Sequence, residues 1–315
     1  MSRQQRRVLD AELRSHPQPS GPVPVEDMRA AFAALMANFP VPDGIRQTPT
    51  VLGNRPAVLV EPTEADDGAA QPGTILYFHG GSFSLGSPET AMVLTAHLVK
   101  RTGVRAISLD YRLAPEHPFP AAIEDCVAAY RDLLANGHEP DSIVFAGDSA
   151  GGGLTVTTCL AARDAGLPMP AALLAFSPGL DHTHAGASMT TKEGIDPIFT
   201  PAGLARNGDI YLAGQDPHQP LLAPAVLADL TGFPPILLQV GTNELLLDDA
   251  VRLAGRARDA EVDVILDVVA GVPHVFPVFV DAIDEAGQAL DRAALFLTQH
   301  LPFPLRLRPP RPGWQ

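Results

Sequence analysis

Nearly continuous apolar runs alternate with stretches of helical periodicity along most of this chain. The apolar runs have the length of strands and cover residues 74–78, 104–109, 143–146, 172–176, 236–240 and 262–269. Helical periodicity occurs between or after them, at residues 120–135, 151–165, 248–260 and 278–297. Strands that are apolar along their whole length are buried on both faces, and intervening helices permit parallel connections. The alternation therefore predicts an α/β fold, with a mostly parallel central sheet and helices on both faces.

Two segments depart from this rhythm. Residues 1–45 carry helical apolar spacing that includes Phe32 and Met36, and they precede the first of these strand-like runs. Residues 180–232 are rich in Pro, Gly, His and Asp and interrupt the alternation. We therefore predict an N-terminal helical cap segment over residues 1–45. The main α/β domain then covers residues 46–315, with a cap insertion at about residues 180–220.

Charge and cysteine content restrict the partners. The formal net charge of −14 disfavours nucleic acid or an anionic membrane as the main partner. Two cysteines provide neither a disulfide framework nor a paired-cysteine metal site, and so few thiols fit a reducing compartment. Charged residues interrupt any apolar core of a signal peptide, and no apolar run is long enough to span a bilayer. We expect a cytoplasmic protein without stable membrane insertion; a homodimer is left open.

A serine stands at the junction of a predicted strand and a predicted helix. The stretch Gly147-Asp-Ser-Ala-Gly151 matches Gly-x-Ser-x-Gly, and two more glycines follow it. In this context the motif forms a nucleophile elbow, which holds a serine on a strained turn where strand and helix cross closely. A phosphate-binding loop would end in Gly-Lys-Ser/Thr, whereas Leu154 follows the last glycine here. Ser149 is therefore the predicted nucleophile.

The segment His79-Gly-Gly-Ser82 follows an earlier predicted strand. Acyl transfer needs backbone N–H groups directed at the oxyanion that develops on the substrate, and glycines allow the backbone to present them. Gly80 and Gly81, with the N–H of Ala150 after the nucleophile, are the predicted oxyanion donors. His79 precedes the serine, so we expect it to hydrogen-bond the loop rather than act as the base.

The base and the acid should follow the serine, with the acid between them. His274 lies on a loop just after a predicted strand, whereas His300 lies near the end of the last helix, so position favours His274. The acid should lie on the loop that begins at Gly241, where Glu244 is favoured and Asp248 is the alternative. Asp248 is equally explained as an acid in the first turn of a helix.

Taken together, these motifs resemble those of the bacterial hormone-sensitive-lipase-like esterases, lipolytic family IV. The resemblance rests on four segments: His79-Gly-Gly, Asp110-Tyr-Arg-Leu-Ala-Pro-Glu-His-Pro-Phe-Pro120, Gly147-Asp-Ser-Ala-Gly-Gly152 and Gly271-Val-Pro-His-Val-Phe276. It implies an α/β-hydrolase fold, an N-terminal helical cap, a Ser-acid-His triad and ester hydrolysis without a cofactor. Ser149, His274 and the three oxyanion residues carry over directly.

Three positions depart from the commoner family pattern. Asn243 stands where most relatives have Asp, and Glu244 matches a branch that uses Glu at the next position. Gly179 follows Ser-Pro where relatives usually have a bulky residue, and Ser82 replaces a third glycine. The resemblance places Gly179 beside the substrate pocket and Ser82 near its mouth. Phe32 and Met36 either line a substrate channel or pack the cap.

Two other groups of residues have weaker claims to function. Asp181-His182-Thr-His184 has alternating histidines, but such isolated pairs rarely bind a metal, and we expect no metal site. Tyr111 and Arg112 are expected to belong to a structural network after the second strand-like run.

The sequence thus predicts a serine carboxylesterase that acts on short- to medium-chain or bulky small-molecule esters. Ser149 is the nucleophile, His274 the base and Glu244 the acid. One alternative is hydrolysis of a lactone or amide in a specialised pathway. The other is a non-catalytic ligand-binding protein on the same scaffold, and such proteins usually lack the histidine.

Overall fold

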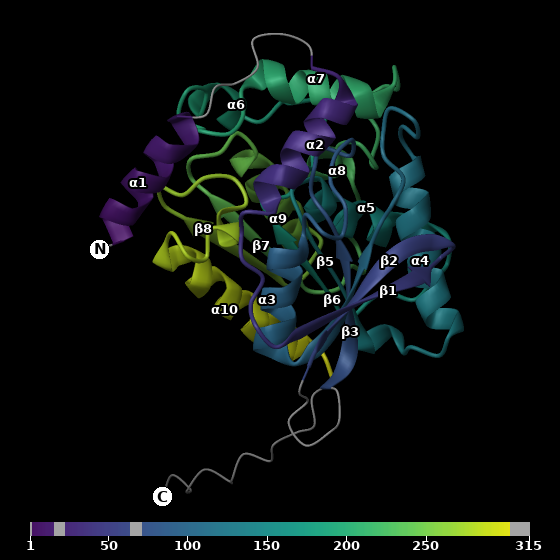
Figure 1. The fold of residues 1–315 in the computed structure, drawn as a ribbon. Helices are drawn as coiled ribbons and strands as arrows, with labels where there is room; N and C mark the ends of the chain where they lie inside the picture. Colours follow the sequence, from purple (N-terminus) through teal and green to yellow (C-terminus); the bar gives the residue numbers. More distant parts are fainter. Residues whose placement is uncertain (1, 16–22, 64–70, 303–315) are drawn as a thin grey trace, which may run out of the picture.

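The computed structural model describes residues 2–15, 23–63 and 71–302 and is built around one eight-stranded sheet (Figure 1). The strand order is β1-β2-β4-β3-β5-β6-β7-β8. The strands are β1 Ile45–Leu52, β2 Arg55–Pro62, β3 Gln71–Phe78, β4 Val104–Leu109, β5 Ile143–Asp148, β6 Ala172–Phe176, β7 Ile236–Gly241 and β8 Val264–Val269. In the part of the sheet with the order β4-β3-β5-β6-β7-β8, neighbouring strands pair in parallel. At the other edge, β2 pairs antiparallel with both β1 and β4. The predicted mostly parallel sheet is therefore confirmed.

Helices cover both faces of this sheet because its central strands are apolar on both sides. On β5, Ile143 and Phe145 join one buried cluster, while Val144 and Ala146 join a second cluster on the other face. The first cluster packs against α4 Ala121–Ala135, α5 Ala150–Asp164 and α9 Leu247–Asp259. The second packs against α3 Met92–Thr102 and α10 Asp284–His300. Each strand thus supplies two cores with alternate side chains.

The sequence pattern found all six strands from β3 to β8 but missed β1, β2 and α3. β1 is largely exposed along its length and contains Pro49, so it lacks the apolar continuity that identified the central strands. The hairpin of β1 and β2 lies at the edge of the sheet, where strands tolerate proline and polar residues. The last predicted helix begins later than expected, at Asp284, because residues 276–278 form a separate short turn.

The two segments predicted to form a cap are helical over much of their described length. The first contains α1 Ser2–Ser15 and α2 Val25–Met36; residues 16–22 lie outside the described part of the chain. The second, predicted at about residues 180–220, contains α6 Ser188–Thr191 and α7 Pro201–Leu212, and α8 Pro224–Leu227 follows it. In Figure 1, α1, α2, α6 and α7 gather at the same end of the molecule. No helix within the described ranges is long and apolar enough to cross a membrane.

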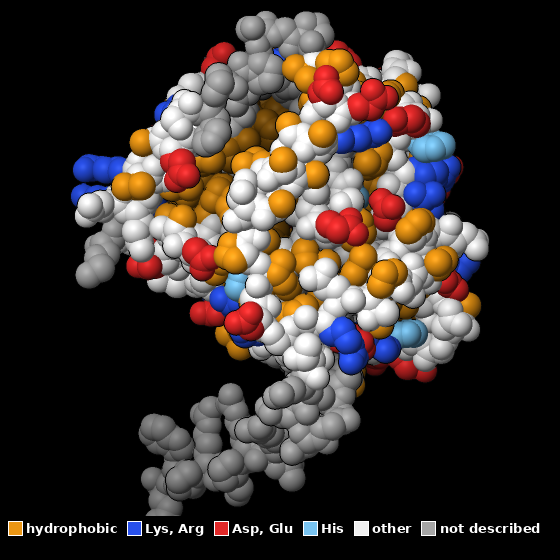
Figure 2. Space-filling model, viewed as in Figure 1, with side chains coloured by type: hydrophobic (Ala, Val, Ile, Leu, Met, Phe, Trp, Pro, Cys, Tyr) orange, Lys and Arg blue, Asp and Glu red, His pale blue; other side chains and the backbone are white. Residues whose placement is uncertain are grey.

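Arginines join α2 to loops of the sheet and α1 to the inserted segment between α6 and α7. From α2, Arg29 donates to the carbonyl of Ser84 (2.9 Å) and to that of Ala114 (3.0 Å). From α1, Arg14 donates to the carbonyls of Gly194 (3.1 Å) and Ile195 (2.6 Å). Figure 2 shows a hollow with hydrophobic side chains at its base between these two helices. The N-terminal segment therefore packs around an opening at this end of the molecule.

Candidate active site

Ser149 occupies a strained turn between β5 and α5. Its backbone angles are φ 53° and ψ −118°, outside the regions that non-glycine residues usually adopt, and α5 starts at the next residue. The strain is held by hydrogen bonds: the N–H of Ser149 donates to the carbonyl of Phe176 (2.8 Å), and its own carbonyl accepts from Gly153 (3.0 Å) and Gly179 (3.0 Å). A strained serine fixed from both sides is the geometry of a nucleophile elbow.

The glycines around this serine are required by close approach of the backbone. A Cβ at Gly147 would overlap the carbonyl of Gly151, and a Cβ at Gly151 would overlap the carbonyl of Phe78. A Cβ at Gly153 would overlap the carbonyl of Gly179. The start of α5 therefore lies so close to the end of β3 and to the loop after β6 that neither Gly151 nor Gly153 has room for a Cβ.

Ser149, His274 and Glu244 form one continuous hydrogen-bonded chain. The Nε2 atom of His274 lies 2.9 Å from Ser149 Oγ, and its Nδ1 atom lies 2.8 Å from Glu244 Oε2. Glu244 is fully buried and His274 is nearly so. The three residues come from the loops after β5, β7 and β8, which meet at the same edge because these strands are parallel.

Hydrogen bonds to its second carboxylate oxygen fix the orientation of Glu244. The Oε1 atom accepts hydrogen bonds from the hydroxyl of Ser177 (2.9 Å) and the N–H of Gly241 (2.6 Å). The same Ser177 hydroxyl accepts from the N–H of Val275, the residue after His274 (2.9 Å). Sequence analysis did not single out Ser177 as a site residue, although its place directly after β6, at the edge where the other site residues lie, was an available signal.

Asp248, the alternative acid, lies elsewhere. Its carboxylate accepts from the N–H of Ser188 (2.9 Å), and the next residue, Asp249, accepts from the N–H of Leu180 (2.7 Å). Burial raises the pKa of Asp249 well above its usual value. Within the described part of the chain, the only carboxylate that hydrogen-bonds His274 is that of Glu244. The geometry thus distinguishes Glu244 from the two aspartates that follow it.

The glycines predicted as oxyanion donors are not equivalent. The N–H of Gly80 donates to Asp148 Oδ1 (3.2 Å), which also accepts from the hydroxyl of Tyr77 (2.9 Å). Burial raises the pKa of Asp148 to about 6. Gly81 has a φ of 123° and would overlap the carbonyl of Leu85 if it carried a Cβ. Ala150 is the first residue of α5, where helix geometry leaves its N–H without a helical acceptor.

His79 and Tyr111 form a buried stacked pair behind this loop. Their rings lie 4.1 Å apart at 10°, and the hydroxyl of Tyr111 donates to the carbonyl of His79 (2.7 Å). Burial lowers the pKa of His79 to about 4, and its Nδ1 lies 2.8 Å from the carbonyl of Gly80. His79 is therefore a neutral residue that supports the loop, as predicted.

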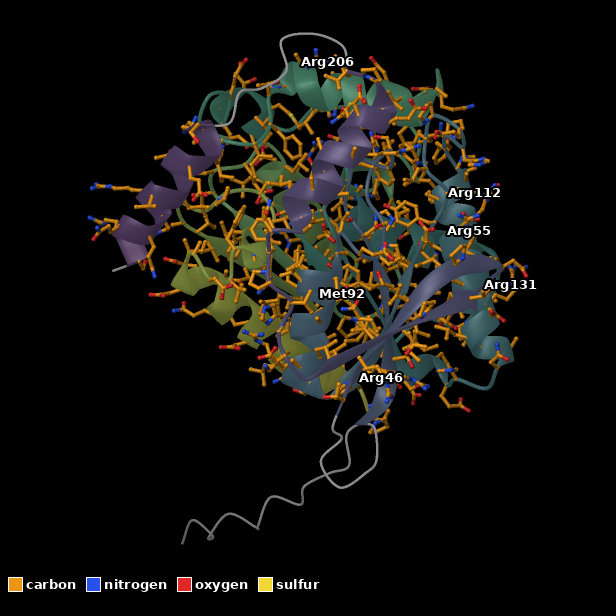
Figure 3. The ribbon with its side chains drawn as sticks, in the orientation of Figure 1. Arg46, Arg55, Met92, Arg112, Arg131 and Arg206 are labelled. Carbon is orange, nitrogen blue, oxygen red and sulfur yellow. The ribbon has the colours of Figure 1, made fainter. Side chains whose placement is uncertain are left out.

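Arg112 belongs to an ionic network at the surface. It pairs with Asp125 (2.8 Å) and with Glu124 (3.0 Å). Arg55 also contacts Asp125 (3.5 Å), and Figure 3 shows the two arginines close together near α4. The expectation of a structural network at Tyr111 and Arg112 is confirmed.

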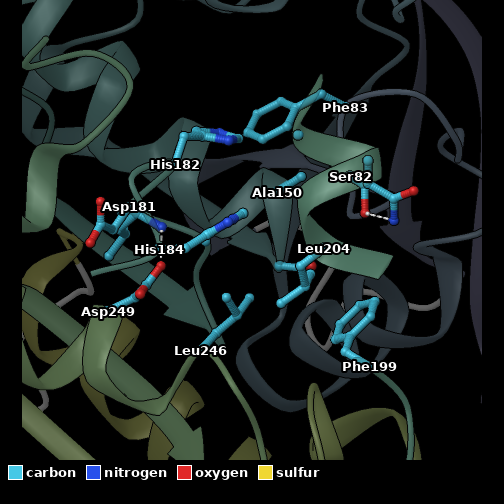
Figure 4. Close-up of a pocket in the computed structure, with 15 residues that line it drawn as sticks. Ser82, Phe83, Ala150, Asp181, His182, His184, Phe199, Leu204, Leu246 and Asp249 are labelled. Carbon is cyan, nitrogen blue, oxygen red and sulfur yellow. Dashed lines mark hydrogen bonds between the residues drawn. The ribbon is translucent and has the colours of Figure 1, made fainter. Parts of the chain in front are cut away.

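A cavity opens beside Ser149 and Ala150. Both Ser82 and Gly179 line it. Apolar walls come from Phe83, Phe199, Leu204 and Leu246 (Figure 4). The cavity beside Ser149 therefore has mainly apolar walls.

Phe32 and Met36 do not line this cavity. Both lie on α2 and are partly buried, and Met36 packs against the buried core together with Phe39. The ring of Phe39 meets that of Phe279 edge-on at 5.6 Å. Of the four predicted pocket residues, Ser82 and Gly179 line the cavity at Ser149. The other two lie on α2, outside the lining of this cavity.

Two residues of the inserted segment that were not identified from sequence contact the site: Asp196 the segment that carries Glu244, and Phe199 the ring of His274. The carboxylate of Asp196 accepts from the N–H groups of Phe199 (2.9 Å) and Leu245 (2.9 Å). It thereby joins the inserted segment to the residue after Glu244. The ring of Phe199 meets the imidazole of His274 edge-on at 4.9 Å. The inserted segment thus covers the site from the side opposite the sheet.

Comparisons with known proteins agree with this architecture. Residues 75–278 match the model of a family described as alpha/beta hydrolase fold. The chain is 41% identical to an acetyl-hydrolase of Streptomyces hygroscopicus over 276 residues, which cover 87% of this chain and 89% of the relative. It is 37% identical to an esterase of Acinetobacter venetianus over 225 residues, covering 71% and 74% of the two chains.

A solved structure is similar over nearly its whole length. The crystal structure of an esterase from the bacterial hormone-sensitive lipase family superposes with a TM-score of 0.88 at 38% identity. The match covers 95% of this chain and 98% of that one. The chain therefore belongs to the alpha/beta hydrolase fold family and, within it, to the bacterial hormone-sensitive-lipase branch of serine carboxylesterases.

Proposed function

We propose that this enzyme hydrolyses small-molecule carboxylic esters with Ser149 as nucleophile, His274 as general base and acid, and Glu244 as the carboxylate that orients the histidine. The observation that carries the proposal is the unbroken hydrogen-bonded chain from Glu244 through His274 to Ser149, with both distances below 3 Å. A serine activated by a histidine, which is oriented in turn by a carboxylate, is the arrangement that nucleophilic acyl transfer requires.

In the proposed reaction, Ser149 Oγ attacks the ester carbonyl carbon while His274 Nε2 takes the hydroxyl proton. The C–O bond to the alcohol then breaks, His274 returns the proton to the leaving alkoxide, and an acyl-serine remains. Water, deprotonated by the same histidine, attacks the acyl-serine, and the acid product leaves as Ser149 regains its proton. Glu244 stabilises the imidazolium formed in both halves of the reaction.

Backbone N–H groups would stabilise the oxyanion of each tetrahedral intermediate. We assign this role to Gly81 and Ala150, with Gly80 as a third donor that contributes less because Asp148 already accepts its N–H. A preorganised donor of this kind lowers the barrier by about 3–4 kcal/mol. The buried pair of His79 and Tyr111 holds this loop in place.

Hydrolysis of p-nitrophenyl butyrate by the purified protein tests the proposal. We expect steady release of p-nitrophenol that is abolished by a phosphonate reagent which labels Ser149. A complete triad favours catalysis over the alternative of a ligand-binding protein. A protein that binds this ester without turning it over, or a label found on another residue, would overturn the assignment.

Gly179 is predicted to widen the pocket. A Cβ added there would lie 3.8 Å from Leu246 Cδ1, an ordinary contact, so the side chain points into space that the cavity shares. We expect the parent to accept bulky or branched esters and Gly179→Trp to shift preference toward acetate and butyrate esters by about tenfold, the scale of one or two methylenes. A series of acyl and alcohol sizes measures this shift.

The matched control is Gly179→Ala, whose single added carbon fits the available space. It should retain the parent's profile. If Gly179→Trp folds and its substrate profile equals that of the parent, Gly179 does not limit the size of the pocket.

The N-terminal segment is proposed to act as a cap. Arg29 joins α2 to the loop that contains Gly81 and Ser82, and Phe39 joins the same segment to Phe279, five residues after His274. Removal of residues 1–40 should therefore reduce activity and solubility together, because the apolar surface under α2 becomes exposed. Kinetics and light scattering on the truncated protein check this. A monodisperse truncated protein with parental kinetics would contradict the cap role.

A further inference from the structure

Two imidazoles project into the cavity from the loop that follows β6. His182 and His184 both line the cavity that contains Ser149, and Figure 4 shows both rings directed from this loop toward the pocket. A Cβ on Gly208 of α7 would lie 3.6 Å from His182 Nδ1 and 3.9 Å from His184 Cε1. The two rings therefore converge on the same part of α7, at the wall of the pocket.

The loop that carries these histidines is fixed by Asp181. Its buried carboxylate pairs with Arg252 (2.7 Å) and accepts from the N–H groups of Thr183 (2.9 Å) and Ala185 (3.2 Å). His184 has a φ of 53°, a conformation uncommon for a residue with a side chain. Such strain persists where surrounding contacts impose it and is concentrated at functional sites. The imidazoles are thus held in place by the protein itself.

Aromatic packing explains the position of one ring but not its chemistry. The ring of His182 lies 5.6 Å from that of Phe83 and 5.4 Å from that of Tyr211, contacts that a phenylalanine would make equally well. Within the described ranges, no hydrogen bond engages a ring nitrogen of His182 or His184. The nitrogens are therefore available to a ligand in the pocket.

Burial determines the protonation state of the two rings, and so the hydrogen bonds that their nitrogens can make. It lowers the pKa of His182 to about 4 and also lowers the pKa of His184, so both rings are neutral near pH 7. A neutral imidazole has one N–H donor and one acceptor nitrogen. On the wall formed by α7, the amide of Asn207 also lines the cavity and donates weakly to Ser82 Oγ (3.4 Å).

The surroundings exclude other ligand classes. An anion would meet no positive charge from the two rings, because burial keeps them neutral near pH 7, and Arg252 is already paired with Asp181. A metal ion needs three or four ligands, and no group of three or more histidine, cysteine or acidic residues suited to a metal occurs among the described residues. A hydroxyl group both donates and accepts, and so it matches a neutral imidazole.

We propose that His182 and His184 form a polar subsite that binds a hydroxyl group carried by the ester, on either its acyl or its alcohol part. The proposal rests on ester hydrolysis at Ser149, because the subsite and the serine share one cavity. It makes the enzyme selective for hydroxylated esters in a pocket whose other walls are mainly apolar.

Two substrate pairs test the subsite and locate the hydroxyl. The acyl pair is p-nitrophenyl butyrate and p-nitrophenyl 3-hydroxybutyrate, and the alcohol pair is propyl butyrate and 3-hydroxypropyl butyrate. For one of the pairs, the parent should show a kcat/KM about tenfold higher for the hydroxylated ester, the effect of one or two satisfied hydrogen bonds. The pair that shows the preference identifies the part of the ester that enters the subsite.

The variants His182→Phe and His184→Phe retain a ring and remove its nitrogens. Each should lower the preference, measured as the ratio of kcat/KM for the hydroxylated and plain esters, at least threefold, and the double variant should abolish it. His218→Phe is the control, because this histidine is largely exposed and pairs only with Asp216 among the described residues. It should leave the preference unchanged.

A binding measurement covers the case in which a histidine variant fails to fold. Folded Ser149→Ala should bind the preferred hydroxylated ester about tenfold more tightly than its plain partner, as measured by calorimetry. A parent that hydrolyses plain esters without any preference, or a preference that survives the double variant, would overturn the subsite but leave the proposed function standing. A parent inactive on all four esters would instead overturn the proposed function, and the subsite with it.

Discussion

Replacement of Ser149 by alanine is expected to lower kcat by at least about 10⁴-fold, because the nucleophile itself is lost. The fold should remain intact. The turn is held by the backbone of residue 149, through its N–H to Phe176 and its carbonyl to Gly153 and Gly179, and alanine keeps all three contacts. Steady-state kinetics with p-nitrophenyl butyrate, together with a thermal melt, separates loss of chemistry from loss of structure.

Ser177→Ala provides the matched serine control. It removes a hydroxyl that contacts Glu244 and the backbone of Val275 but is not placed on the substrate, so its effect on kcat should be much smaller than that of Ser149→Ala. Activity of Ser149→Ala within tenfold of the parent would exclude this serine as the nucleophile.

Glu244→Gln is expected to lower kcat by at least about 10²-fold, and far more than Asp248→Asn. Glutamine lacks the negative charge that stabilises the imidazolium, and its amide cannot reproduce both acceptor oxygens of the carboxylate. Among the residues that the structure describes, the carboxylate of Asp248 accepts only from the N–H of Ser188 in the inserted segment, so its change should produce at most a moderate loss. Parallel kcat measurements on the two variants check this order.

Comparison of Glu244→Gln with Asp248→Asn also shows which of the two residues is the acid of the triad. Both substitutions replace a carboxylate by its amide, four residues apart in the segment after β7, so general effects of lost charge are shared. If Asp248→Asn were the more damaging change, Glu244 would not be the acid of the triad.

The sequence was most informative where the physical constraint is local. Central strands buried on both faces must be apolar throughout, so β3 and β5 to β7 were recognisable from a short run of residues. The elbow was recognisable because its residues are consecutive in the chain, between a strand-like run and a helical stretch, and Gly147 is required by a contact with Gly151 only four residues away. By contrast, β1 lies at a sheet edge, where few side chains are buried and the pattern carries little information.

Residues that act through distant contacts could not be identified in this way. Ser177 contacts Glu244, 67 residues away, and Asp196 contacts the backbone of Leu245, 49 residues away. Neither residue type is unusual at its position. The engagement of Gly80 by Asp148 likewise depends on a contact 68 residues apart, so sequence analysis treated Gly80 and Gly81 as equivalent donors.

The hydroxyl of Ser177 makes the placement of acid and base a single event. It donates to Glu244 while it accepts from the backbone next to His274, so the loops after β6, β7 and β8 share one oxygen atom. If the histidine loop moves outward, that oxygen loses the N–H of Val275, and Glu244 Oε2 loses its contact with His274 in the same movement. Misalignment of the base and misalignment of the acid are therefore correlated rather than independent errors. The resting enzyme should divide between an aligned population and a fully misaligned one, with few molecules in which only one partner is displaced.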